Sequence, residues 1–114
     1  MDDGRAGLLM KPPSRVKIGA SVWTVAVVKD LSDAGGGDLY GRSSPKSVSI
    51  EMSATQDDQQ MRDTLLHEVM HAIVSNIPLF KNAGQEERVL RALTPWLLAV
   101  LRENNALTSY LVEK

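Results

Sequence analysis

The chain contains no cysteine and only two histidines among its 114 residues. Without cysteine the protein has neither a disulfide framework nor a thiolate metal ligand, which is compatible with the cytoplasm, where we expect it to reside. Both histidines lie close together, at positions 67 and 71. Any third protein ligand of a metal ion that they bind must therefore be an oxygen atom.

Long apolar runs and a strong charge of one sign are also missing. No stretch of about 18 apolar residues could span a bilayer. The first residues lack the basic start and the apolar core of a secretory signal. The formal net charge is -1, with acidic and basic residues interleaved. Nothing in this pattern attracts nucleic acid or an anionic membrane, so we expect neither as a partner.

Composition predicts one ordinary globular domain. Apolar residues make up 43% of the chain and charged residues 24%, as in typical globular proteins. A chain of this length can bury well over half of its unfolded surface, but a second domain does not fit. We expect a flexible N-terminal tail over residues 1–14 and a single domain over residues 15–114.

The first half of the domain has the pattern of β-strands. β-Branched and aromatic residues on either side of Gly19-Ala20 predict a hairpin over residues 15–30. A glycine-rich loop follows over residues 31–38, and another strand can begin at residue 39. Alternating polar and apolar residues predict a half-exposed edge strand over residues 47–52. We expect an antiparallel sheet whose edge could pair with an extended peptide.

The second half has the pattern of helices. Thr55 begins a sequence that resembles a capping box, and a helix is predicted over about residues 56–76. Asn82-Ala83-Gly84-Gln85 resembles the cap of a second helix, which Pro95 should kink or restart. A short helix over residues 107–111 completes the core. The predicted fold class is α+β, with the N-terminal antiparallel sheet packed beside the helices.

The first helix contains His67-Glu68-Val69-Met70-His71, a motif of the form H-E-x-x-H. Residues four apart on an α-helix differ by about 40° around the axis and about 6 Å along it, so both imidazoles can bind one zinc ion. Glu68 would lie beside the ion, where its carboxylate can accept a proton from metal-bound water. A solvated helix face is the alternative, because the apolar stripe containing Leu65 and Val69 lies opposite the histidines.

A carboxylate on the second helix is the candidate third ligand. Glu86 is favoured because it shares a stripe with apolar residues of that helix. Those residues are Val89, Leu93, Trp96 and Val100. Glu87 is the alternative ligand, since it can pair outward with Arg91 four residues later. Both glutamates could also serve only to complement the dipole at the helix N-terminus.

The order of these segments resembles that of small zincin-like metallopeptidases encoded by phages and prophages. The resemblance covers residues 15–112. It rests on Asp38-Leu39-Tyr40-Gly41, on the motif and its neighbours in residues 65–73, and on Glu86-Glu87-Arg88-Val89. The chain also resembles, more distantly, the ImmA/IrrE-type peptidases, which cleave repressors in phage or stress regulation.

The resemblance implies a gluzincin-like site for a zinc ion. The metal ligands would be His67, His71 and either Glu86 or Glu87, and Glu68 would be the catalytic base. The chain departs from relatives that have a further histidine to stabilise an oxyanion, so Tyr40 or Tyr110 would have to take that role, or the metal would act alone. A metzincin is excluded, because Ile77 occupies the position of its third histidine.

These features predict a zinc-dependent metallopeptidase that hydrolyses peptide bonds of a protein or peptide substrate in phage or prophage regulation. The alternative is a catalytically inactive zincin-like module that binds metal and acts by protein interaction. A small interaction protein without metal is a third interpretation. The sequence indicates neither a cleavage specificity nor an oligomeric state.

Overall fold

The computed structural model describes residues 11–32, 35 and 39–114. Residues 1–10 of the expected tail and most of the expected glycine-rich loop lie outside the described residues. The described part contains strands β1 Arg15–Ile18, β2 Ser21–Val28, β3 Gly41–Ser44 and β4 Ser49–Ser53, and helices α1 Asp58–Val74, α2 Ala83–Glu103 and α3 Asn105–Val112. The predicted α+β class is confirmed.

The sheet is mixed, so the prediction of an antiparallel sheet was wrong. The four strands lie in the order β1-β2-β4-β3. β1 pairs with β2 and β3 pairs with β4 in antiparallel fashion, whereas β2 and β4 are parallel, with Thr24 opposite Ser49. The mixed order arises because β4 enters between β2 and β3 instead of extending the sheet.

Burial explains why β4 takes an inner position although the sequence predicted it at the edge. Ile50 and Met52 on β4 are completely buried and need neighbours on both sides. β3 consists of Gly41-Arg42-Ser43-Ser44 and has no large apolar side chain, which suits an edge strand. β3 therefore forms one edge of the sheet, and on its outer side no other strand of the described residues pairs with its backbone.

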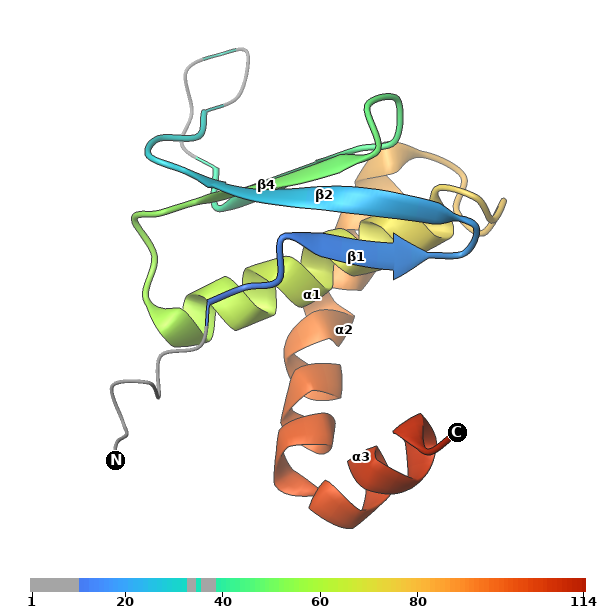
Figure 1. Cartoon of the computed structure of the whole chain (residues 1–114). Helices are drawn as coiled ribbons and strands as arrows, with labels where there is room; N and C mark the ends of the chain where they lie inside the picture. Colours follow the sequence, from blue (N-terminus) through green and yellow to red (C-terminus); the bar gives the residue numbers. More distant parts are fainter. Residues whose placement is uncertain (1–10, 33–34, 36–38) are drawn as a thin grey trace.

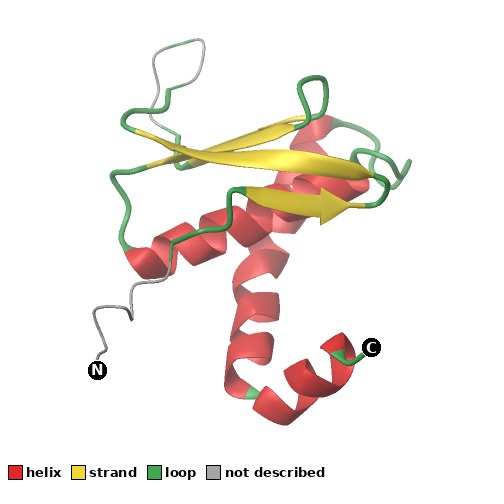
Figure 2. Ribbon diagram, viewed as in Figure 1, coloured by secondary structure: helices red, strands yellow, loops and turns green. Residues whose placement is uncertain are grey.

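The core lies between one face of the sheet and α1. Its buried residues are Trp23, Val25, Ile50 and Met52 from the sheet and Ala72 from α1. Figure 1 shows α1 running beneath the sheet, with α2 leading away from it and α3 folding back at the far end of α2. Figure 2 shows the same separation of a strand layer from the helices. The sheet and α1 thus enclose the core, and α1 carries the two motif histidines.

Helix α1 begins slightly later than predicted. Its N-cap is Asp57, whose side chain accepts a hydrogen bond from the backbone N–H of Gln60 at 2.8 Å. Thr55, the predicted cap, instead shares a 2.8 Å hydrogen bond with the hydroxyl of Ser53. Thr55 is engaged in the turn that leaves β4, so the first acidic residue after it caps the helix.

Helix α2 begins where the sequence predicted, with the Asn82 side chain accepting a hydrogen bond from the N–H of Gln85 at 2.8 Å. It continues as one helix through Pro95 to Glu103, so the restart at Pro95 does not occur. The predicted short last helix is present as α3, but it has no buried residue and, among the described elements, packs only on α2, so the prediction that it completes the core was wrong. None of the helices in the described residues has the length and apolarity needed to cross a membrane.

Candidate metal centre

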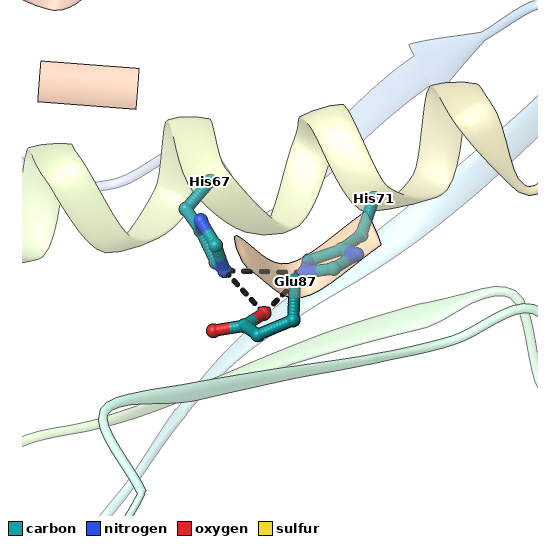
Figure 3. A group of neighbouring side chains, drawn as sticks. All are labelled: His67, His71 and Glu87. Atoms are coloured by element: carbon teal, nitrogen blue, oxygen red, sulfur yellow. Dashed lines mark hydrogen bonds and ion pairs between the residues drawn. The ribbon is translucent and has the colours of Figure 1, made fainter. Parts of the chain in front are cut away.

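The two motif histidines lie one turn apart on α1 and face the first turns of α2. The Nε2 atoms of His67 and His71 are 3.1 Å apart. One carboxylate oxygen of Glu87, Oε1, lies 3.1 Å from Nε2 of His67 and 2.8 Å from Nε2 of His71. Figure 3 shows these three atoms converging on one point from the two helices.

The triangle of ligand atoms fits a small divalent ion. Zinc is bound by nitrogen and oxygen atoms at about 2.0–2.1 Å, so two of its tetrahedral ligands lie about 3.3 Å apart. The three distances within the group, 2.8–3.1 Å, are close to this spacing. Two histidines and one carboxylate also leave a fourth position for water or substrate, as in catalytic zinc sites. This group can therefore hold a metal ion.

The hydrogen bonds of His71 give a second reason to expect a cation. Nδ1 of His71 lies 2.6 Å from Oε2 of Glu86. Because an ionised carboxylate can only accept, Nδ1 must carry the proton and donate it. Nε2 of a neutral His71 then has a lone pair that faces the oxygen of Glu87, which is also an acceptor. Two facing acceptors repel, so positive charge is needed between them.

The electrostatics agree with this need for positive charge. Burial alone lowers the pKa of His71, but the hydrogen bonds with Glu86 and Glu87 outweigh burial and leave that pKa above its ordinary value. A second proton on His71 thus removes the repulsion between Nε2 of His71 and the oxygen of Glu87, as a metal ion would. Binding of a metal would replace that proton.

The two glutamates have different positions. Glu87 lies with the two histidines, and Glu86 lies behind His71 on the other ring nitrogen. The preference for Glu86 rested on a shared apolar stripe facing the core, but the apolar members of that stripe are exposed: Val89, Leu93, Trp96 and Val100. The side of α2 that packs on α1 carries the buried Leu90 and Thr94 instead. The geometry favours Glu87, the alternative, as the third ligand.

The ion pair of Glu87 with Arg91 was predicted from their spacing, and it is present. Both Nε and Nη2 of Arg91 donate to Oε2 of Glu87, at 3.0 and 2.6 Å. This pairing uses only one carboxylate oxygen, and Oε1 still faces the histidines. The prediction that pairing with Arg91 would turn Glu87 outward overlooked that a carboxylate has two oxygens. The pair itself was predicted, but the sequence did not indicate that Arg91 would fix the orientation of a candidate metal ligand.

Glu68 lies next to the ligand triangle but outside it. Only 6% of Glu68 is exposed, which is unusual for a carboxylate. Burial raises the pKa of Glu68 above its ordinary value, although the nearby His67 and His71 lower it in part. A carboxylate with a raised pKa is a better proton acceptor, which suits a general base.

A cleft of about 670 Å³ opens beside Glu68 and the ligand group. It is lined by residues of β3 and the segment before it, of α1 and of α2: Leu39, Tyr40, Gly41, Gln60, Asp63, Thr64, His67, Glu68, Glu87 and Arg91. Of the two tyrosines proposed to stabilise an oxyanion, Tyr40 lines this cleft. Tyr110 lies on α3 and does not line it. Of the two tyrosines, Tyr40 is therefore the one placed to reach a substrate in the cleft, and Arg91 lines the same cleft.

Gly41 allows β3 to approach α1 closely at the cleft. A Cβ atom at this position would lie 2.5 Å from Cγ2 of Thr64 and 3.1 Å from Cγ of Glu68. The approach is reinforced by Gln56, which donates to the backbone oxygen of Tyr40 at 2.9 Å and accepts from Thr64 at 2.7 Å. The sequence showed a glycine here but gave no sign of which side chains it would face.

We predict that Gly41→Ala lowers the free energy of unfolding by about 1–3 kcal/mol, because the added methyl group overpacks the contact with Thr64 and Glu68. Urea unfolding of both proteins measures the change. Gly84→Ala is the matched control, since its nearest neighbour would be the Asn82 side chain at 3.3 Å and alanine favours a helix. Equal stability of the two variants would contradict the close approach at Gly41.

The fold and the site define an α+β domain with a candidate metal centre between two helices. Comparison of the chain with models of protein families, with curated proteins and with solved structures found no match. The functional argument therefore rests on the geometry of the site and on the chemistry of its residues.

Proposed function

We propose that this chain is a zinc-dependent metallopeptidase with a minimal zincin-like fold. One observation carries the proposal: the ligand group of His67, His71 and Glu87 lies beside the buried carboxylate of Glu68 at an open cleft. A structural metal site has four protein ligands and needs neither a neighbouring base nor a cleft. The combination is therefore better suited to hydrolysis than to holding the fold together.

The residues divide the chemistry of peptide hydrolysis between them. His67, His71 and Glu87 would hold the zinc ion, which supplies Lewis acidity to water and to the substrate carbonyl. Glu68 accepts a proton from the attacking water molecule while the water oxygen adds to the carbonyl carbon. Glu68 then donates this proton to the nitrogen of the leaving amine as the C–N bond breaks. Arg91 and Glu86 hold Glu87 and His71 in place.

The substrate that we propose is an extended peptide bound along the free edge of β3. Among the residues that the structure describes, this strand pairs with β4 on one side only, and its first residue, Gly41, lines the cleft. Backbone groups of a sheet edge can bind a peptide as an additional strand. The sequence assigned this role to the segment that became β4, and the observed strand order supports β3 in its place.

The resemblance to phage and prophage peptidases supports a regulatory protein as the substrate. We also propose a cytoplasmic location, with which the lack of cysteine is compatible. Zinc is the metal that we propose because two imidazoles and one carboxylate are a common catalytic zinc ligand set.

Metal content and hydrolysis together test the proposed function. Protein purified without chelator or metal-affinity resin is expected to contain about one zinc ion per chain. It should cleave peptides in a quenched-fluorescent library, lose this activity with a chelator and regain it with zinc. Bound zinc without any cleavage would favour the non-catalytic binding module, and absence of zinc would contradict both.

A further inference from the structure

The second half of α2 and α3 form an arm with little packing of its own. We define the arm as residues 95–112, which begin directly after the buried Thr94. No residue of the arm is buried, and α3 packs on α2 alone among the described elements. Figures 1 and 2 show α2 leading away from the sheet and α3 turning back at its end. The arm therefore stands off from the core.

The arm exposes more large apolar side chains than a solvated surface explains. Trp96 and Tyr110 are 75% and 76% exposed. The exposed aliphatic residues of the arm are Leu97, Val100, Leu107, Leu111 and Val112. The radius of gyration, 15.1 Å, agrees with a protruding element, since a compact chain of this size has a radius of about 13 Å.

We propose that the arm is the interface of a homodimer, in which the arms of two copies pack against each other. Aromatic side chains of this exposure offer about 150 Å² each, and the aliphatic residues of the arm add a comparable total. Together they offer about 600 Å², which is most of the surface of about 800 Å² that one partner contributes to a standard interface. Two helices from each copy can pack as a four-helix arrangement around a twofold axis.

The charges on the arm favour a second copy over a lipid surface. The arm carries one basic residue, Arg102, and one acidic residue, Glu103, so it has no net charge. An anionic lipid surface would call for an excess of lysine and arginine. In a twofold pair, Arg102 of one copy can face Glu103 of the other without like-charge repulsion.

The proposed interface leaves the metal centre free. Glu87 lies in the first turns of α2, on the side that faces the histidines, and the arm begins two turns later. Dimer formation does not require the proposed peptidase activity. An experiment that contradicts one of the two proposals therefore does not contradict the other.

Sedimentation velocity of the full chain over a range of concentrations tests the dimer. The wild type is expected to move from monomer to dimer as its concentration rises, and Leu111→Glu is expected to remain monomeric. Leu79→Glu is the matched control, because Leu79 is 61% exposed and Leu111 is 60% exposed, but Leu79 lies outside the arm. This control should dimerise like the wild type.

Fluorescence gives an independent measurement. Trp23 is 3% exposed in the core and keeps its surroundings, so a change of the emission on dilution reports on Trp96. The emission should shift to shorter wavelength as the dimer forms. A wild type that stays monomeric up to millimolar concentration overturns the proposal, whether or not its arm binds neutral vesicles. A dimer that survives Leu111→Glu and Trp96→Glu also overturns it.

Discussion

Glu68→Gln is expected to lower the rate of peptide hydrolysis by about 10²–10⁴-fold while zinc remains bound, because general acid–base catalysis contributes about this factor. The amide has nearly the shape of the carboxylate but cannot accept a proton from water. Glu68 belongs to none of the contacts between the ligand atoms, so the affinity for zinc should change little. Initial rates under zinc saturation measure the effect.

Folding should not explain the loss of activity in this variant. Burial raises the pKa of Glu68, which means that its ionised form is costly to bury. A neutral amide avoids this cost, so the variant should unfold at a temperature no lower than that of the wild type. Asp63→Asn is the matched control, because Asp63 is another acidic residue of the cleft and lies outside the ligand group. Hydrolysis at the wild-type rate by Glu68→Gln would contradict the assignment of Glu68 as the general base.

Glu87→Gln is expected to weaken zinc binding more than Glu86→Gln does. Glu87→Gln replaces a charged ligand oxygen with a neutral one, whereas Glu86→Gln removes only the charge of the group that orients His71, because an amide oxygen can still accept from Nδ1. Complete removal of an orienting group of this kind typically costs about 10–100-fold in metal affinity, and the amide should cost less. Competition with a chromophoric chelator at one fixed pH measures both affinities.

The control for this pair is Glu103→Gln, which removes a carboxylate from the end of the same helix. It should bind zinc like the wild type. If Glu86→Gln were the weaker binder of the two, the roles of the glutamates would be exchanged, and Glu86 would be the ligand that the stripe on α2 suggested. The order of the two affinities therefore decides between the two assignments.

Local features were predictable because they depend on neighbours in the sequence. The cap at Asn82, the helix around the motif and the break at Gly19-Ala20 follow from side-chain hydrogen bonds, periodicity and backbone preferences. Gly19 has a φ angle of 63°, which favours glycine in the β1–β2 turn. The position of β4 was not predictable in this way, since strand order depends on which segments bury Ile50 and Met52.

The phase of α2 shows why periodicity alone misled. This helix has apolar residues on two faces, and periodicity cannot tell which face packs on α1. The buried residues of α2 are Leu90 and Thr94, and the hydroxyl of Thr94 lies 3.5 Å from the sulfur of Met70 on α1. The more apolar face, with Trp96, remains exposed, and the part of it that lies in the arm belongs to the proposed dimer interface.

The sequence by itself determined that His67 and His71 share one helix face, that Glu68 adjoins them and that any third ligand is an oxygen. These statements need only the helix geometry and the composition. Tertiary structure alone decided that Glu87 completes the group, that Glu86 and Arg91 support it, and that β3 borders the cleft. Such relations depend on how α2 and the sheet pack around α1, and packing joins residues that the sequence keeps far apart.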